Sequence, residues 1–137
     1  MEYWLLKSEP NVYSWEQLVH DKETIWDGVR NYAARLNLMG MKKGDMAFFY
    51  HSNAGMEIVG IVKISKTYFQ DPSTEDERWV SVCVKPFKKL HNPVALAAIK
   101  NEKDLAQMDL VRLGRLSVQK VQKKEWEKVL EMSHTKI

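Results

Sequence analysis

One stretch of the chain combines an aromatic side chain, an acidic residue and two arginines in a short distance. It reads Trp26-Asp27-Gly28-Val29-Arg30-Asn31-Tyr32-Ala33-Ala34-Arg35. A helical pattern begins directly afterwards, and Asp27 is predicted to cap that helix by accepting from backbone N–H groups one turn later. A helix N-terminus with Arg30 and Arg35 beside it favours an anion, and Trp26 offers a flat surface. This pattern favours the binding of a nucleotide. The alternative is that Trp26 belongs to the core and that the two arginines face solvent.

Polar residues also stand at the ends of three predicted strands. The triplets are Lys7-Ser8-Glu9, His51-Ser52-Asn53 and Arg115-Leu116-Ser117. The strand ends of a barrel gather around one opening, and hydroxyl, amide and backbone groups both donate and accept hydrogen bonds, as the edge of a nucleobase demands. Taken singly, each triplet is explained by hydrogen bonds to a loop backbone or to water. Together with Trp26 and Trp79 they favour a pocket for a planar polar ligand.

Signatures of common enzymes are absent from the sequence. There is no glycine-rich phosphate loop, no pair of histidines at metal spacing and no Gly-x-Ser-x-Gly segment. The single cysteine, Cys83, excludes an internal disulfide and a cysteine-rich zinc site. The candidates for acid–base chemistry are Glu9, Asp27 and Asp45. Each also has an adequate structural role: Glu9 at a strand end, Asp27 as a helix cap and Asp45 in a turn. We therefore predict no metal and no other cofactor.

The composition is that of an ordinary intracellular protein. The chain has 137 residues, 45% of them hydrophobic and 28% charged, which predicts one soluble domain over residues 1–137. A net charge of +3 permits a nucleic-acid partner but does not indicate an extended basic surface. No segment has the length and apolarity of a membrane span or a signal peptide, so we expect a cytoplasmic location and no membrane partner. The absence of heptads and of a long apolar face predicts a monomer.

Apolar periodicity and turn residues predict a mixture of strands and short helices. An uninterrupted apolar run from Ile58 to Val62 predicts a strand buried on both faces, and Gly60 within it predicts a close backbone approach. Ser14 begins a capping box, and Asn92-Pro93 has the residues of a helix start. The predicted strands are 3–7, 46–52, 57–69, 78–87 and 116–121, and the predicted helices are 15–20, 28–40, 92–99, 104–108 and 124–132.

This order of elements predicts an α+β fold. The sheet is expected to be mixed, mainly antiparallel and curled into a small barrel, with short helices over its openings. The central helix is expected to bury a face at helical spacing. That face comprises Val29, Tyr32, Ala33, Leu36 and Met39.

Several segments of the sequence resemble the EVE domain family. They are Tyr3-Trp4-Leu5-Leu6-Lys7-Ser8-Glu9-Pro10, Trp26-Asp27-Gly28-Val29-Arg30-Asn31-Tyr32, Phe49-Tyr50-His51-Ser52-Asn53, Ile58-Val59-Gly60-Ile61 and Arg115-Leu116-Ser117-Val118. The likeness runs from residue 2 to about residue 130. It implies a PUA-like pseudo-barrel related to the YTH domains that read methylated adenine. It also implies a pocket for a modified base: methylated or hydroxymethylated cytosine in DNA, or a modified base in RNA.

The sequence departs from the family pattern in three places. Ala34-Arg35-Leu36-Asn37-Leu38-Met39 stands where the family usually has Ala-Arg-Asn-x-Leu-Arg, and Tyr68-Phe69-Gln70-Asp71-Pro72 replaces Tyr-Pro-Asp-Pro. The loop between Pro72 and Arg78 is several residues shorter than is common in the family. Fewer basic groups leave the choice between DNA and RNA open. Stand-alone copies of such domains occur in bacteria and archaea, and we expect such an origin.

We expect a non-enzymatic module that takes a modified, flipped or single-stranded base of a nucleic acid into the barrel mouth. Trp26 would stack on the base, while Ser8, Asn53 and nearby backbone would read its edge. The phosphate would be held by Lys7, Arg30 and Arg35.

Two alternatives stay open at this point. The first is an enzyme that acts on nucleic acid or a nucleotide, with Asp27 or Glu9 as base and His51 as partner. The second is a barrel that binds a small molecule or a protein. The candidate site residues are Lys7, Ser8, Trp26, Asp27, Val29, Arg30, Asn31, Arg35, His51, Ser52, Asn53, Trp79, Leu116 and Ser117.

Overall fold

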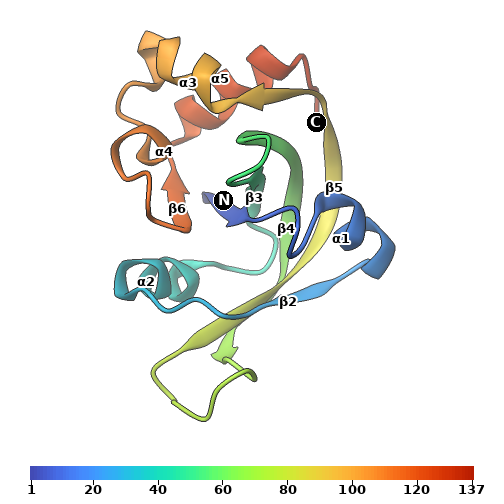
Figure 1. Cartoon of the computed structure of the whole chain (residues 1–137), viewed down its shortest axis with the longest axis vertical. Helices are drawn as coiled ribbons and strands as arrows, with labels where there is room; N and C mark the ends of the chain where they lie inside the picture. The colour runs from blue at the N-terminus through green and yellow to red at the C-terminus, as the bar shows by residue number, and fades with distance from the viewer.

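The computed structural model describes residues 1–137 and shows a six-stranded sheet with short helices around it (Figure 1). The elements are β1 (Tyr3–Ser8), α1 (Trp15–Asp21), β2 (Thr24–Trp26), α2 (Tyr32–Gly40), β3 (Met46–His51), β4 (Glu57–Gln70), β5 (Val80–Ala95), α3 (Leu96–Asn101), a 3-10 helix η1 (Lys103–Leu105), α4 (Asp109–Arg112), β6 (Val118–Val121) and α5 (Lys123–Ser133). No helix combines the length and the apolar character that a membrane crossing requires.

The sheet is mixed and mainly antiparallel, as predicted. Its order is β2-β5-β4-β3-β1-β6, and only the β1–β3 pair is parallel. Helix α2 contacts β6 at one edge and β5 and β4 toward the other. The Asn37 side-chain amide also donates to the Val118 carbonyl at 2.8 Å. Helix α2 therefore bridges the two ends of a curved sheet and completes a pseudo-barrel.

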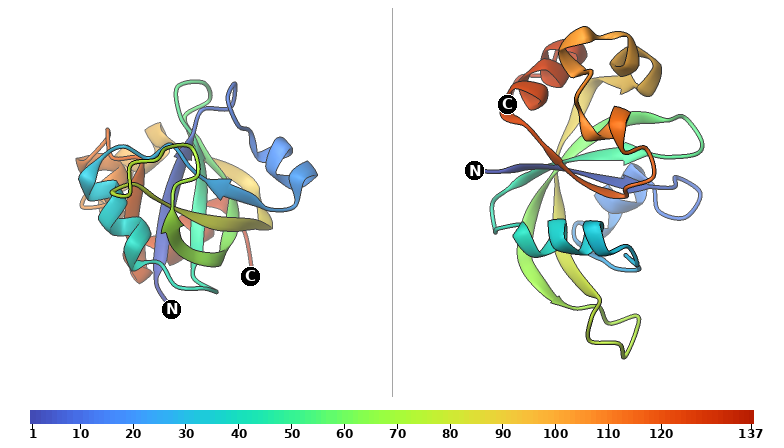
Figure 2. Two further views of the ribbon diagram at one scale, coloured as in Figure 1. Left: turned by 90° about the horizontal axis from the view of Figure 1, so that it is seen from below. Right: turned by 90° about the vertical axis from the view of Figure 1, so that its left-hand side faces the viewer.

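Both faces of the central strands are buried because each face has its own apolar core. Along β1, Trp4 and Leu6 enter one core while Leu5 enters the other, which is the alternation of a strand. Helices α1 and α2 lie on one side of the sheet and α3, α4 and α5 on the other (Figure 2). Two layers of helices thus cover the sheet.

The prediction for the apolar run in β4 is confirmed. All five residues from Ile58 to Val62 are buried. A side chain at Gly60 has no room, because a Cβ atom built there would lie 2.5 Å from the ring of Trp15. Ser14 caps α1 by accepting from the Gln17 N–H at 3.0 Å, which confirms one half of the predicted capping box, while the Gln17 side chain donates to Asp21 and does not accept from the Ser14 N–H.

The prediction of a helix start at Asn92-Pro93 is wrong, because both residues belong to β5 and the helix begins at Leu96. Strand β5 pairs with β2 only from Val82 to Val84. Beyond Val84 its outer edge has no strand partner, and proline is tolerated on an edge that makes no ladder hydrogen bonds there. The predicted helix over 104–108 is instead η1 followed by α4, and β6 begins two residues later than expected.

The start and the buried face of the central helix also differ from the prediction. Helix α2 begins at Tyr32, and its N-cap is Asn31, whose side chain accepts from the Ala34 N–H at 3.0 Å. Asp27 cannot cap it because Gly28 has φ +78°, which is incompatible with a helix. The buried helical residues are Ala34 and Leu38; Tyr32, Ala33 and Leu36 are exposed, Met39 is partly buried, and Val29 is buried ahead of the helix.

Candidate functional site

A cavity of about 650 Å³ opens between the end of β1, strand β2 and the start of β6. Three separate segments line it: residues 7–9 with 12 and 13, residues 24–30, and the single residue Ser117. Seven of the predicted site residues lie in its wall, so the structure brings together segments that the sequence separates. These seven are Lys7, Ser8, Trp26, Asp27, Val29, Arg30 and Ser117.

Hydrogen bonds hold the β1 end of the cavity in place. The Lys7 N–H donates to the Ser117 carbonyl at 3.0 Å, which ties β1 to the residue before β6. The Ser8 hydroxyl donates to the Tyr13 carbonyl at 2.5 Å, so its oxygen lone pairs remain available as acceptors. The Lys7 ammonium donates to the Gly114 carbonyl, and burial lowers the pKa of Lys7.

Trp26 lines the cavity but is more deeply buried than expected. Only 9% of the residue is exposed. Its ring packs edge-to-face against Phe49 at 5.6 Å and against Tyr13 at 6.5 Å between ring centroids. Trp26 therefore has the surroundings of a core tryptophan, which is the alternative that the sequence left open, and little of its flat surface is exposed. Strand β2 is at the sheet edge, and its pairing with β5 places this side chain toward the barrel interior.

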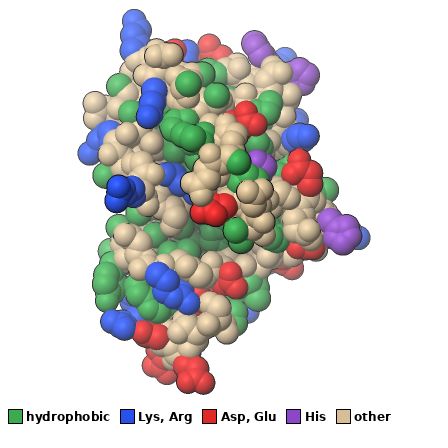
Figure 3. Space-filling view, viewed as in Figure 1, with side chains coloured by type: hydrophobic (Ala, Val, Ile, Leu, Met, Phe, Trp, Pro, Cys, Tyr) green, Lys and Arg blue, Asp and Glu red, His purple; other side chains and the backbone are tan.

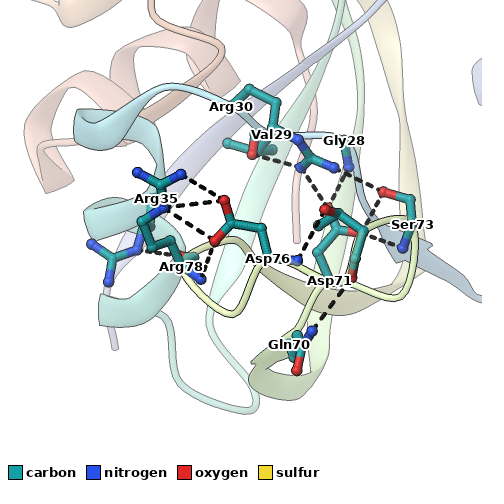
Figure 4. A network of polar contacts seen from close by, with 10 residues as sticks. Gly28, Val29, Arg30, Arg35, Gln70, Asp71, Ser73, Asp76 and Arg78 are labelled. Atoms are coloured by element: carbon teal, nitrogen blue, oxygen red, sulfur yellow. Dashed lines mark hydrogen bonds and ion pairs between the residues drawn. The ribbon is translucent and has the colours of Figure 1, made fainter.

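The turn after Trp26 is held by a carboxylate that sequence reasoning placed in an ordinary loop. Asp71 is fully buried and accepts from the Gly28 N–H at 2.8 Å and from the Arg30 guanidinium at 2.8 Å (Figure 4). It also accepts from the backbone and the hydroxyl of Ser73 at 2.7 and 2.6 Å. Burial raises the pKa of Asp71, but these hydrogen bonds outweigh burial and lower it to about 2. The ionised carboxylate thus fixes the turn that carries Asp27.

The arginines near this turn are already engaged within the protein. Arg30 pairs with Asp71 and lies 5.7 Å from the ring centroid of Trp79. Arg35 donates from Nε to the Arg78 carbonyl. Trp79 packs against the Tyr32 ring at 5.3 Å between centroids. Arg35 and Trp79 therefore hold the loop between β4 and β5 and do not line the cavity.

The residues around the β3–β4 turn also lie outside this cavity. The His51 Nε2 atom accepts from the Trp15 N–H at 3.1 Å, which satisfies the first N–H of α1. Burial lowers the pKa of His51, and this favours the neutral ring that the hydrogen bond requires. Ser52 and Asn53 line a second cavity of about 400 Å³. Two more of the predicted site residues do not line the first cavity. Asn31 caps α2, and Leu116 is partly buried against the core.

The three candidate acid–base carboxylates have different surroundings. Glu9 and Asp27 line the first cavity and are exposed. Asp45 is buried elsewhere and accepts from the Trp4 indole N–H at 3.0 Å and from two backbone N–H groups. Asp45 therefore has a structural role.

The cavity wall presents acceptors, donors and apolar groups together. Glu9 and Asp27 supply carboxylates, Lys7 supplies an ammonium, and Ser8 and Ser117 supply hydroxyls. On the face seen in Figure 3, lysine and arginine side chains lie mainly on the left, while acidic side chains lie in the middle, at the right and at the lower tip. The side chains that line the first cavity can therefore form hydrogen bonds with the polar edge of a planar ligand.

Comparison with known proteins identifies the family. The sequence model of the EVE domain matches residues 2–132. This chain belongs to the EVE domain family.

Relatives of this EVE domain are found in animals and bacteria. Thymocyte nuclear protein 1 of Mus musculus is 36% identical over 167 aligned positions, which cover 97% of this chain and 74% of the mouse protein. The alignment is longer than this chain, so the mouse protein has additional residues within it. The NMR structure of Rpa0253 from Rhodopseudomonas palustris is 46% identical with a TM-score of 0.93, over 98% of this chain and 94% of that chain.

Two solved structures of similar proteins contain nucleic acid. Human THYN1, in complex with DNA that contains 5-methylcytosine, is 32% identical to this EVE domain with a TM-score of 0.91, over all of both chains. The YTH domain of the Zygosaccharomyces rouxii MRB1 protein, in complex with N6-methyladenosine RNA, has a TM-score of 0.61 over 96% of this chain and 86% of that chain. Its identity is 15%, so this likeness concerns the fold alone and agrees with a PUA-like barrel.

Sequence reasoning missed part of the cavity wall of this EVE domain. Val12, Tyr13, Thr24 and Ile25 line it, although sequence reasoning assigned none of them to a ligand site and did not predict the strand β2 that contains Thr24 and Ile25. Thr24 and Ile25 directly precede Trp26, and this proximity along the chain is the signal that could have indicated them, whereas Val12 and Tyr13 had none. Asp71 had no such signal, because its partners Gly28 and Arg30 lie more than forty positions away. No group of three or more His, Cys, Asp or Glu side chains is arranged to hold a metal ion.

Proposed function

We propose that this EVE domain binds nucleic acid that carries a modified base and holds that base, flipped out or unpaired, in the cavity between β1, β2 and Ser117. The observation that carries this proposal is the human relative in complex with 5-methylcytosine DNA, whose fold matches along the entire chain. The cavity of about 650 Å³ supports it, because sites for small ligands have volumes of about 300–1,000 Å³. A base can enter a cavity of this kind only after it has left the stack.

The wall chemistry indicates how the base is held. The Asp27 and Glu9 carboxylates accept from an exocyclic amino group, such as that of cytosine or adenine. The Lys7 ammonium donates to an acceptor of the same edge, and the Ser8 oxygen, whose own hydrogen goes to the Tyr13 carbonyl, accepts from a donor. Trp26 forms a rigid aromatic wall, because its ring is fixed by core neighbours. A base methyl group would contact the apolar part of the wall.

We further propose that the domain binds its ligand without converting it. The Ser8 hydroxyl donates to a backbone carbonyl, and the His51 Nε2 accepts from a backbone N–H. Neither residue therefore forms a nucleophile–base pair, which covalent catalysis by a serine requires. A cytoplasmic location, a monomeric state and the single domain over residues 1–137 remain part of the same proposal.

A titration against oligonucleotides tests the proposal. Fluorescein-labelled single strands and duplexes of DNA, and single strands of RNA, carry cytosine, 5-methylcytosine or 5-hydroxymethylcytosine at one position, and affinity is measured by anisotropy. We expect tighter binding to a modified strand than to its unmodified partner, with the oligonucleotide mass unchanged after incubation. Equal affinity for all strands, or a changed oligonucleotide mass, would overturn the proposal.

A matched pair of variants connects the affinity to this cavity. Asp27→Ala removes a carboxylate from the wall, whereas Glu77→Ala removes one from an exposed loop position outside it. We expect Asp27→Ala to weaken binding about tenfold or more, as losing a hydrogen bond to a charged group does, and Glu77→Ala to bind normally. Normal binding by Asp27→Ala would place the base elsewhere.

A further inference from the structure

A second cavity, of about 400 Å³, adjoins the first cavity across Lys7. It lies between the β3–β4 turn and the segment that contains α3 and α4. Two lysines, Lys7 and Lys100, form part of its wall, together with the polar Ser52 and Asn53 and apolar side chains such as Leu96. No carboxylate lines it. In this it differs from the first cavity, where Glu9 and Asp27 are present.

Lys7 is a cation without a counter-anion. Its residue is partly buried, and its ammonium donates to the Gly114 carbonyl and lies 5.8 Å from the ring centroid of Tyr50. It takes part in no ion pair. Burying a charge without a partner is costly, and the lowered pKa of Lys7 has this cause. An anion in the adjoining cavity would supply the missing partner.

Lys100 is the second unpaired cation of this cavity. It is exposed in the last turn of α3 and forms no ion pair, whereas Lys128 on α5 lies within 4 Å of the carboxylates of Glu102, Asp104 and Glu131. The cavity therefore has two ammonium groups in its wall and no carboxylate, in the wall or in an ion pair, to neutralise them. Its charge is complementary to a phosphate group.

We propose that the second cavity takes the phosphate and sugar of the nucleotide next to the base that occupies the first cavity. This inference rests on the proposed function and specifies its ligand as a strand with at least one flanking nucleotide. Lys7 lines both cavities, so a base in one and a phosphate in the other lie within reach of one side chain, as neighbouring parts of one strand do. Met56, which is 44% exposed, and Leu96 provide apolar contact for the sugar.

Three small probes test this inference: the nucleoside 5-methyldeoxycytidine and the two dinucleotides that carry thymidine on its 5′ or its 3′ side. Binding is measured by calorimetry or by NMR titration at several salt concentrations. We expect one dinucleotide to bind about tenfold more tightly than the nucleoside, because a charge-assisted hydrogen bond to phosphate is added. Its affinity falls with salt, with a slope of about 0.7 per phosphate contact.

Lys100→Gln is the diagnostic variant, because Lys100 lines only the second of these two cavities. We expect it to lose most of the dinucleotide gain and the associated salt slope, while its affinity for the nucleoside is unchanged. Lys103→Gln is the matched control, since Lys103 is exposed nearby and lines neither cavity. Thermal melting confirms that both variants are folded.

The outcomes separate the two proposals. A nucleoside that binds as tightly as both dinucleotides, or a dinucleotide gain that survives Lys100→Gln, would overturn the second cavity as a phosphate site and leave the first cavity as the base site. Failure of all three probes to bind the unmodified protein at millimolar concentration would overturn the proposed function and this inference together.

Discussion

Replacing Asp71 with asparagine is expected to loosen the turn that carries Asp27. The Asp71 carboxylate is buried and accepts from Gly28, from Arg30 and twice from Ser73. The amide of asparagine is almost the same size but neutral, with one oxygen replaced by a donor. The variant therefore keeps the packing and loses both the charge and one hydrogen-bond acceptor.

The magnitude follows from the pKa of Asp71. Burial raises this pKa, but the hydrogen bonds from Arg30, Ser73 and Gly28 lower it from 3.8 to about 2. At about 1.4 kcal/mol per pKa unit, the ionised carboxylate contributes about 2 kcal/mol to the free energy of unfolding. Because the pKa is lower in the folded state, this contribution is complete above pH 3.8 and is lost as the pH falls toward about 2.

Urea denaturation at neutral pH and at several acidic pH values measures this contribution. We expect Asp71→Asn to be less stable than the natural protein by about 2 kcal/mol at pH 7, and the difference to diminish as the pH falls toward about 2. Glu77→Gln is the control, since Glu77 is exposed in the same loop. An Asp71→Asn variant as stable as the natural protein at pH 7, or a deficit that stays constant down to pH 2, would refute this account of the turn.

Three further outcomes are expected. Trp26→Ala should cost about 3–5 kcal/mol in a thermal or urea melt, because the residue is only 9% exposed; a loss below about 1 kcal/mol would show that the ring is not part of the core. Gly60→Ala should destabilise the fold by about 1–3 kcal/mol, because its Cβ atom would overlap the Trp15 ring, whereas Gly114→Ala, where nothing lies within 4 Å, should be near neutral; equal melting temperatures of the two variants would contradict this. The free energy of unfolding, measured with urea, should fall as the pH drops below about 6.5, because burial lowers the pKa of His51 and the unfolded chain takes up the proton more readily. The variant His51→Gln should flatten that part of the pH profile. An unchanged profile would remove His51 as its cause.

The central strands could be predicted because their apolar pattern is local. The run from Ile58 to Val62 is uninterrupted, and Gly60 within it has the close contact that the sequence suggests. Capping at Ser14 is also local, since donor and acceptor are three residues apart. Burial on both faces and short-range hydrogen bonds leave clear signals in a single sequence.

The parts that could not be predicted depend on contacts between distant segments. Asn92 and Pro93 have the residue types of a helix start, yet the chain on either side of them, at Lys89 and Val94, pairs with β4, and the segment between stays in the strand. Asp27 precedes a helical pattern, but Gly28 donates to Asp71, forty-three positions away, and holds a conformation that a helix does not allow. Asp71 also forms an ion pair with Arg30, which the sequence alone predicted to be a phosphate ligand.

The candidate site could be predicted in part for the same reason. The segments that contain Lys7, Trp26 and Ser117 converge because each adjoins a strand of the barrel, and strand ends gather around an opening. Asn53 also follows a strand, but it stands in a left-handed turn with φ +65° and lines the second cavity. Which cavity receives a given strand end depends on sheet curvature, and residue types do not specify it.

An NMR titration of the ¹⁵N-labelled protein with a single-stranded DNA that contains one 5-methylcytosine tests the central claim most directly. We expect the largest shifts at the backbone amides of Ser8, Gly28 and Ser117 and at the indole N–H of Trp26, all of which belong to the wall of the first cavity. The same strand with unmodified cytosine should cause smaller shifts at these positions. Shifts confined to the surface of α5, with none at Gly28 or Ser117, would contradict the assignment of this cavity as the site of the modified base.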